Sequence, residues 1–214
     1  MLYRKVLRKI KRFFDGLIGD MSDEIFWKYK SFNTTSHPHL IDQLFKSLPF
    51  DSVLEIGCAD GANLRKINEK LPKIKLEGID INKKTINVGN NILKNDGILN
   101  VTLKYKNAKD LNLYDAKEFD VVFCSATLMY IAPNNINKVL VNMVRIATKS
   151  ILLCEQSTED NSFYDDKWVH NYKNILTTIP NIQSVHFHSI PEEFSNGDSD
   201  WLKYGKVIEI IKKV

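Results

Sequence analysis

The feature that most constrains the fold is a regular alternation of apolar runs and amphipathic segments after Pro49. The runs SVLEIG, KLEGID, VTLKY, FDVVFCS and SILLCE are short and rich in β-branched residues, which is typical of buried strands. Amphipathic segments begin between them near Gly61, Asn82 and Pro133, and proline suits the first turn of a helix. This alternation predicts a doubly wound α/β fold with a mostly parallel sheet.

Two further apolar stretches near the C-terminus, IQSVHFHSI and GKVIEIIKK, are separated by the polar stretch PEEFSNGDSDWLKY. We expect two strands joined by a loop, without a helix between them, as a closing antiparallel pair. Before this pair, the segment WVHNYK places Trp168 and Tyr172 four residues apart. That spacing predicts a helix with both rings on one face, either in the core or as an apolar wall of a binding pocket.

The N-terminal part of the chain differs in composition from the rest. Residues 1–21 carry apolar side chains at three- and four-residue spacing with basic residues between them, which predicts an amphipathic helix. We therefore divide the chain into an N-terminal helix and lid segment, residues 1–30, and a globular domain, residues 31–214. The helix either packs on the domain or lies on an anionic membrane surface.

The charge of the chain is concentrated at the same end. The net charge of the chain is +4. The six Lys and Arg residues that precede Asp15 alone carry +6, so the rest of the chain carries a net charge of −2. This distribution argues against a nucleic-acid partner, because such binding depends on Lys and Arg neutralising phosphates along a continuous face.

Neither a membrane span nor a secretory signal is predicted, because no apolar run has the length or the position that these segments need. We expect a cytoplasmic protein, with peripheral contact to the inner face of the membrane through residues 1–21 left open. The three cysteines, Cys58, Cys124 and Cys154, each end a predicted strand and show no CxxC spacing. They predict buried free thiols, with neither a disulfide framework nor a metal site.

The turn after the first predicted strand is the clearest binding signal. It reads VLEIGCADGANL, residues 53–64, and a doubly wound sheet binds its ligand at this place, outside the carboxyl ends of the strands. Glu55 and Asp60 would repel a pyrophosphate, since like charges about 4 Å apart cost roughly 1 to 4 kcal/mol. The dinucleotide spacing GxGxxG is also missing. The turn therefore favours a cationic cofactor.

A further acid follows at the end of the next predicted strand. Asp80 ends the run KLEGID, 23 residues after Gly57, where a carboxylate can accept hydrogen bonds from both hydroxyls of a ribose. Enzymes that use NAD place an acid in the same way, so Asp80 indicates an adenosine more firmly than it indicates which cofactor. Its alternative role is to cap the helix that begins near Asn82. Ile81 would cover one face of the adenine or belong to the core.

The ordered set VLEIGCADG, EGIDIN, KNAKDLNL and FDVVFCSATLMYI resembles the motifs of class I S-adenosylmethionine-dependent methyltransferases over about residues 50–155. The resemblance implies a Rossmann-like, seven-stranded, mostly parallel sheet with one antiparallel C-terminal strand, and S-adenosylmethionine as cofactor. The residues that it implies at the cofactor are Glu55, Gly57, Cys58 and Gly61 on the methionine and ribose side, Asp80 at the ribose hydroxyls, Asn107 and Ala108 at the adenine edge, and Ser125 at the end of the fourth strand.

Two positions depart from the family pattern. Ala59 stands where the family usually has glycine, and its methyl group narrows the turn without blocking it. Asn107 replaces the usual adenine-binding carboxylate. Its side-chain oxygen can still accept from the adenine amino group, or the residue can serve only as part of a turn.

Methyl transfer to a hydroxyl needs a base, and three residues near the carboxyl edge of the predicted sheet are candidates. Glu155 lies at the end of the fifth predicted strand, His170 follows in WVHNYK, and Tyr130 lies near the end of the LMYI run. Each could instead have a purely structural role. Glu155 could cap a helix or turn, His170 could be a solvated helix residue, and Tyr130 could pack in the core. His37 and His39 precede the first strand, and one of them would face the acceptor if this segment folds over the cofactor.

The sequence predicts transfer of a methyl group from S-adenosylmethionine to oxygen or nitrogen of a small or carbohydrate acceptor. Enzymes that methylate exocyclic amines of nucleobases commonly have an Asn or Asp followed by two prolines and an aromatic residue after the fourth strand. The stretch SATLMYI does not contain this ordered motif. Bacterial methyltransferases of surface-glycan synthesis are loosely similar to this chain in three segments, namely FWKYKSFNTTSHPHL, EQS and the closing W-x-x-x-G. The alternatives are a nicotinamide-dependent oxidoreductase and a non-catalytic, membrane-associated binding subunit.

Overall fold

The computed structural model describes residues 36–160, 162–164, 167–194 and 198–213. The predicted helix of residues 1–21 and the lid up to residue 30 lie outside these ranges. Nine strands are described, and their bounds are β1 Ser52–Ile56, β2 Lys75–Asp80, β3 Val101–Tyr105, β4 Phe119–Ser125, β5 Ala147–Gln156, β6 Ser162–Tyr164, β7 Lys167–Val169, β8 Ile182–Ser189 and β9 Gly205–Lys212.

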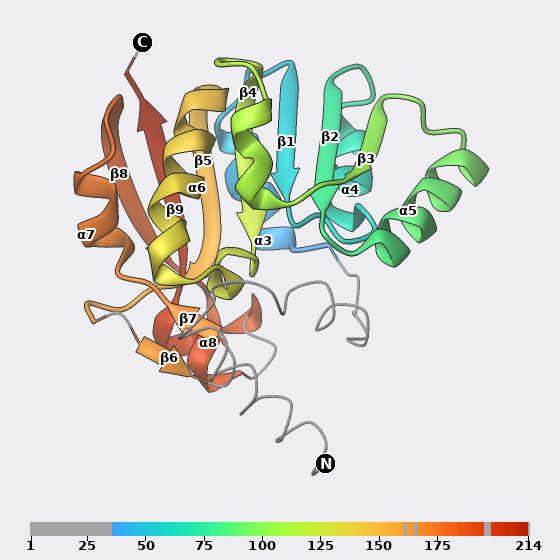
Figure 1. Cartoon of the computed structure of the whole chain (residues 1–214). Coiled ribbons are helices and arrows are strands. Elements are labelled where there is room, and N and C mark those ends of the chain that lie inside the picture. The colour runs from blue at the N-terminus through green and yellow to red at the C-terminus, as the bar shows by residue number, and fades with distance from the viewer. Residues whose placement is uncertain (1–35, 161, 165–166, 195–197, 214) are drawn as a thin grey trace.

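Seven of these strands form one sheet in the order β3-β2-β1-β4-β5-β9-β8. Strands β1 to β5 pair in parallel, and β9 runs antiparallel to both of its neighbours, β5 and β8. The predicted Rossmann-like α/β sheet with one antiparallel strand at the C-terminus is therefore confirmed. Its carboxyl edge faces downward in Figure 1, where the β6–β7 hairpin also lies.

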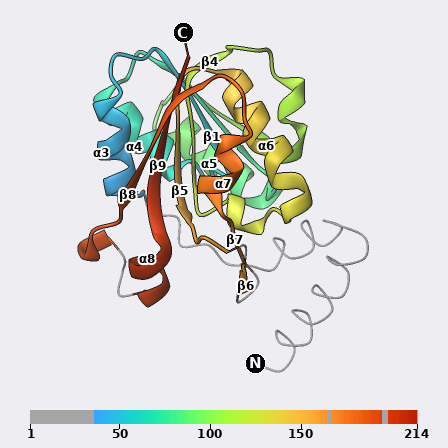
Figure 2. The same cartoon turned by 90° about the vertical axis from the view of Figure 1, so that its left-hand side faces the viewer.

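Helices cover both faces of the sheet, as the two views in Figures 1 and 2 show. No helix within the described ranges is long and apolar enough to cross a bilayer. The helices are α3 Pro38–Lys46, α4 Ala62–Lys70, α5 Lys83–Asn95, α6 Pro133–Ile146, α7 Tyr172–Thr177 and α8 Ser199–Tyr204, with 3₁₀ turns η1 Ala108–Leu113, η2 Leu128–Tyr130 and η3 Glu192–Phe194.

Each face of the sheet has its own apolar core. One core packs α6, α7 and η1 on the sheet and contains Leu54, Ile56 and Leu140. The other packs α3, α4 and α5 on the opposite face and contains Val53, Leu64 and Ile86. Neighbouring residues of β1 thus contribute to opposite cores, as expected for a strand covered by helices on both sides.

Two expectations about the last third of the chain are wrong. A short helix, α8, lies between β8 and β9, and the Asp198 side chain caps it by accepting from two backbone amides. Trp168 belongs to strand β7, whereas Tyr172 begins α7, so the two rings do not share a helix. Six-residue helices are too short for a periodic pattern to identify.

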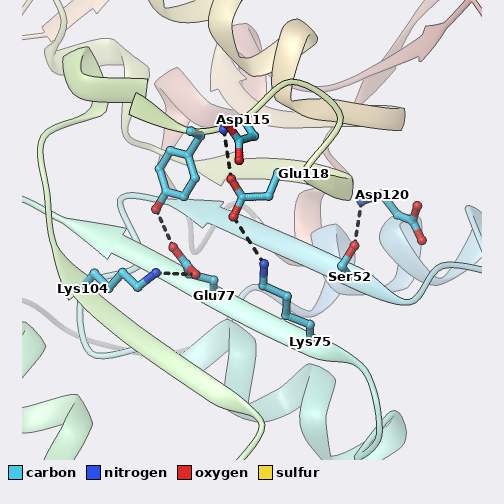
Figure 3. A network of polar contacts seen from close by, with 8 residues as sticks. Ser52, Lys75, Glu77, Lys104, Asp115, Glu118 and Asp120 are labelled. Atoms are coloured by element: carbon cyan, nitrogen blue, oxygen red, sulfur yellow. Dashed lines mark hydrogen bonds and ion pairs between the residues drawn. The ribbon is translucent and has the colours of Figure 1, made fainter. Parts of the chain in front are cut away.

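A buried acid on β2 belongs to the framework of the sheet. Glu77 is only 3% exposed, and both of its carboxylate oxygens have partners. The Tyr114 hydroxyl donates to Oε1 at 2.5 Å and Lys104 Nζ lies 2.7 Å from Oε2, as Figure 3 shows for Lys104. Nearby, Lys75 pairs with Glu118 at the edge of the same network. A buried carboxylate that is paired and hydrogen-bonded in this way is neutralised within the fold.

Helix α5 comes into close contact with the glycine turn between β1 and α4. A Cβ atom placed on Gly89 would lie 2.4 Å from the carbonyl oxygen of Asp60 and 2.5 Å from Cδ1 of Leu103. Because the first of these neighbours is backbone, the contact cannot be relieved by a side-chain rotation. The glycine therefore sets the distance between α5 and the turn.

We predict that Gly89→Ala lowers the free energy of unfolding by about 1 to 3 kcal/mol, even though alanine is the better helix former. Urea denaturation of the variant measures the change. The matched control is Asn91→Ala on the exposed side of the same helix, which should change stability by less than about 0.5 kcal/mol. Equal stability of Gly89→Ala and the wild type would contradict this account of the contact.

Candidate cofactor and acceptor site

The turn between β1 and α4 has an unusual backbone. Gly57, Ala59 and Gly61 have φ values of 74°, 48° and 79°, all in the left-handed region. The amides of Gly57 and Cys58 donate to the carbonyl of Ile79 on β2, at 2.8 and 3.0 Å. The turn is thereby fastened to the strand that carries Asp80.

Ala59 is the residue of this turn that combines a Cβ atom with a left-handed backbone. A residue with a Cβ atom in the left-handed region loses roughly 1 to 2 kcal/mol relative to glycine. The turn keeps this conformation because the Ala59 amide donates to Asp80 Oδ2 at 2.9 Å. Backbone strain that is held by surrounding contacts is common where a ligand binds.

Asp80 acts as a bridge between two loops. Its Oδ2 accepts from Ala59, and its Oδ1 accepts from the backbone amide of Asn82 at 2.7 Å. The cap of α5 is Asn82, whose side-chain oxygen accepts from the amides of Lys84 and Thr85. The alternative role proposed for Asp80, a helix cap, thus falls to its neighbour. Burial raises the pKa of Asp80 above its usual value.

Glu55 is the least satisfied acid of the site. It is 2% exposed, and Oε1 accepts from Asn63 Nδ2 at 2.7 Å. Its other oxygen, Oε2, is buried and has no hydrogen-bond partner within the described ranges. Burial raises the pKa of Glu55 to about 8, and the negative charges of Asp80 and Asp60 contribute to the rise. Glu77 is buried to the same extent but has hydrogen-bond or ion-pair partners on both oxygens.

The third acid, Asp60, is partly neutralised. Arg65 on α4 lies 3.5 Å from Asp60 Oδ2 and also donates to the Asp60 carbonyl. Neither Glu55 nor Asp80 forms an ion pair with any residue in the described part of the chain. An unpaired buried carboxylate is costly, and a cation nearby would remove that cost. These residues therefore fit a ligand with a positive charge.

The remaining residues expected at the cofactor lie at the same carboxyl edge. Ser125 ends β4, and its carbonyl accepts from the Thr127 hydroxyl at 3.0 Å. Asn107 follows β3, and its side-chain oxygen accepts from the backbone amide of Lys109 at 2.9 Å. The turn role left open for Asn107 is therefore present in the structure. Ile81 and Ala108 are half-buried beside them.

Thr127 was not singled out from the sequence, yet it touches the glycine turn. A Cβ atom on Gly57 would lie 2.1 Å from Thr127 Oγ1. Glycine at this position lets the loop after β4 approach the turn after β1. A threonine two residues past a strand end carries no pattern of its own, so no sequence signal could have identified it.

Glu155 is completely buried and its carboxylate faces backbone. Oε1 accepts from the amides of Thr127 and Leu128 at 2.7 and 2.8 Å, and Oε2 accepts from the amide of Met129 at 3.3 Å. Cys124 also contacts Oε1 through its thiol. Burial raises the pKa of Glu155 to about 7, although the amides oppose this shift. The capping role left open for Glu155 is thus what the structure shows, and it fixes η2.

His170 is also buried, so the solvated alternative is wrong. Its Nε2 lies 3.2 and 3.1 Å from the carbonyls of Leu128 and Ile131, and donates to them because both are acceptors. The ring packs edge-on against Tyr172, and burial lowers the pKa of His170. Tyr130, the last residue of η2, is half-buried. Tyr130 therefore belongs to this turn, and the other two candidate bases, Glu155 and His170, hold its backbone.

The histidines before β1 lie against the body of the protein. His37 caps α3, with Nδ1 accepting from the Leu40 amide at 3.2 Å, and its Nε2 lies 3.6 Å from the Cys154 thiol. The His39 ring stacks on Phe194. All three cysteines are free and buried, as expected, and burial raises the pKa of Cys154 to about 12. Among the described residues, no group of three or more side chains is arranged to hold a metal.

Known proteins similar to this chain agree with the geometry. Residues 53–150 match the family model described as a methyltransferase domain. An uncharacterised protein of Rickettsia prowazekii is 31% identical over 124 residues, which cover 55% of this chain and 49% of that protein. The chain thus spans about half the length of this curated relative.

Two solved structures illustrate the likeness in fold. A phosphoethanolamine N-methyltransferase of Haemonchus contortus, in complex with phosphomonomethylethanolamine and S-adenosylhomocysteine, has a TM-score of 0.68 at 11% identity, over 94% of this chain and 59% of that one. The magnesium protoporphyrin IX methyltransferase of Synechocystis, with bound S-adenosylmethionine, has a TM-score of 0.59 at 14% identity, over 96% of both chains. At such identities the likeness establishes the fold.

We predict that Glu155→Ala lowers the free energy of unfolding by about 3 kcal/mol or more, because three buried amides lose their common acceptor. Urea denaturation measures the loss. Glu159→Ala, at an exposed position in the loop after the same strand, is the control and should be close to neutral. A stable Glu155→Ala protein that lacks activity would instead favour the role of Glu155 as a base.

We also predict that Glu55→Gln stabilises the ligand-free protein at alkaline pH. The pKa of Glu55 is about 8 in the folded state and 4.5 for the unperturbed side chain, so its ionisation favours unfolding. The contribution of Glu55 to the free energy of unfolding is most favourable below about pH 4.5, where the side chain is neutral in both states. This contribution is lost as the pH rises through about 8. Glu55→Gln should therefore be more stable than the wild type by about 1 to 3 kcal/mol at pH 8.5.

The measurement is urea denaturation of both proteins without ligand between pH 5 and 8.5. Glu69→Gln, on the exposed side of α4, is the control, and its difference from the wild type should not vary with pH in this way. A difference between Glu55→Gln and the wild type that stays constant across the range would contradict the prediction.

Proposed function

Since residues 53–150 form a methyltransferase domain within a class I S-adenosylmethionine-dependent methyltransferase fold, we propose that this protein transfers a methyl group from S-adenosylmethionine to a small-molecule acceptor. The bound cofactor supplies a methyl group activated by a positive sulfonium. The residues of the chain then hold the cofactor, exclude water and place the acceptor on the axis of the displaced bond.

One observation carries this proposal. Glu55 is buried and Asp80 is half-buried beside a left-handed glycine turn, and neither forms an ion pair in the described part of the chain. Glu55 Oε2 also has no hydrogen-bond partner among the described residues. S-adenosylmethionine brings an ammonium group and two ribose hydroxyls. We assign the ammonium to Glu55 and the hydroxyls to Asp80, whose oxygens each retain a lone pair after accepting one backbone amide.

The same observation speaks against the nicotinamide alternative. A pyrophosphate at this turn would meet Glu55, Asp60 and Asp80, and only Asp60 has a cationic neighbour, Arg65. Two like charges about 4 Å apart repel each other by roughly 1 to 4 kcal/mol. The turn would have to expose cations or free amides instead, as dinucleotide-binding turns do.

Nitrogen is the acceptor atom that we favour. Glu155 and His170, two of the three candidate bases, are buried and hold the backbone of η2, so they are poorly placed to take a proton from a hydroxyl. An amine that is already deprotonated needs no base in the displacement step. Tyr130, half-buried on the same turn, is the candidate that we place against the acceptor.

We propose a small polar molecule as the acceptor, with a carbohydrate amine as one member of that class. The support comes from two sources. The two solved neighbours are named for small-molecule acceptors, phosphoethanolamine and magnesium protoporphyrin IX. The sequence itself, from residue 26 to residue 40 and in its closing part, is loosely similar to surface-glycan methyltransferases.

The test is calorimetric binding of S-adenosylmethionine, S-adenosylhomocysteine and NAD to the wild type, Asp80→Asn and Asp80→Ala. We expect the first two ligands to bind and NAD not to bind. Asp80→Ala should weaken S-adenosylhomocysteine binding by about tenfold to a hundredfold, because hydrogen bonds to a charged group contribute about 1.5 to 3 kcal/mol. Asp80→Asn should lie in between.

Asp96→Ala, at the exposed C-cap of α5, is the control and should bind like the wild type. NAD binding, or no binding of any of the three ligands to folded wild-type protein, would overturn the proposed function. Binding without transfer to any amine or hydroxyl acceptor in a screen would favour a binding subunit.

A further inference from the structure

A short chain of hydrogen bonds connects Glu55 to the start of α3. Asn63, in the first turn of α4, donates from Nδ2 to Glu55 Oε1 at 2.7 Å. Its Oδ1 accepts from the backbone amide of His37 at 2.7 Å. His37 is the N-cap of α3 and lies 26 residues earlier in the chain. Three elements that are separate in sequence, namely α3, α4 and β1, are thereby joined through one side chain.

Asparagine is well suited to this position. It must accept at one end, from a backbone N–H, and donate at the other, to a carboxylate. Aspartate could not donate, and an apolar residue could do neither. The two partners also determine the orientation of the amide group, because the reverse orientation would set Nδ2 against the His37 amide and Oδ1 against Glu55. Asn63 is only 9% exposed, so water does not replace these bonds easily.

The far end of the chain is fixed as well. Nδ1 of His37 accepts from the Leu40 amide, so the proton of the neutral ring is on Nε2. That nitrogen faces the thiol of Cys154 at the carboxyl end of β5. Burial lowers the pKa of His37, which keeps the ring neutral and able to cap. The first turn of α3 is thus attached to the same edge of the sheet that carries the cofactor site.

We propose that Asn63 is a positioning residue for Glu55 and couples occupancy of the cofactor site to the order of the first turn of α3. This proposal rests on the proposed function, because it takes Glu55 as the partner of the cationic end of the cofactor. When a cation pairs with Oε2, it favours the ionised form of Glu55, and the bond from Asn63 to Oε1 becomes charge-assisted and stronger. Asn63 then holds the His37 amide more firmly.

The coupling is reciprocal. If ligand binding stabilises the first turn of α3, then order in that turn must favour ligand binding by the same factor. Asn63 also opposes the effect of burial on Glu55, since its hydrogen bond lowers the pKa of that carboxyl. Loss of Asn63 should therefore move the pH dependence of cofactor binding to higher pH.

The experiment combines calorimetry with amide hydrogen exchange, and S-adenosylhomocysteine is the probe. In the wild type, saturating probe should slow exchange in the peptide that covers residues 37–46. In Asn63→Ala the probe should bind about tenfold more weakly or worse, and saturation should no longer slow exchange there. The control is Asn68→Ala, which removes the same amide from the same helix at a side chain whose Oδ1 has no hydrogen-bond partner. It should behave like the wild type in both measurements.

A second variant guards against a loss of folding. Asn63→Asp has the same shape and keeps an acceptor for the His37 amide, but it presents an oxygen to Glu55. It should leave exchange in α3 unchanged without ligand and still weaken probe binding. Wild-type affinity and wild-type protection of α3 in either Asn63 variant would overturn the inference. Failure of the folded wild type to bind the probe would overturn the proposed function, and the inference with it.

Discussion

Close packing around the turn between β1 and α4 is the constraint on which the rest of the structure depends. The turn is held on three sides, by the Ile79 carbonyl of β2, by the backbone of α5 at Gly89 and by Thr127 after β4. Each of these contacts depends on a residue without a Cβ atom or with a left-handed backbone. The glycines therefore act as spacers that bring three strand ends together, and the acids at those ends become neighbours as a result.

That neighbourhood has an electrostatic consequence. Glu77 shows that this sheet can bury an acid at low cost, because Lys104 and Tyr114 satisfy it. Glu55 lies on the adjacent strand, in register beside Gly78, and has only the amide of Asn63. The carboxylate of Glu77 is thus paired with a cation within the fold, whereas the carboxylate of Glu55 has no cationic partner among the described residues. On the proposed function, a cationic cofactor would pair with Glu55 and restore the stability that the ligand-free protein lacks there.

The sequence predicted the parts of the fold that depend on local pattern. The β-branched runs located the strands, and Gly61, Asn82 and Pro133 marked helix starts to within one residue. The short helix α8 and the β7 strand were missed because six and three residues do not establish a period. Asp198 did carry a capping signal for α8, but the surrounding polar residues made a loop the simpler interpretation.

Roles within the site were harder to predict, because they depend on which way a buried side chain turns. Glu155 at a strand end is equally compatible with catalysis and with capping, and only the direction of its carboxylate toward the amides of Thr127, Leu128 and Met129 separates the two. His170 then supports the same turn from the carbonyl side. With donors and acceptors of η2 both satisfied by buried groups, the turn is rigid. This arrangement supports the nitrogen acceptor that we propose, because an amine that is already deprotonated has only to be aligned with the methyl group.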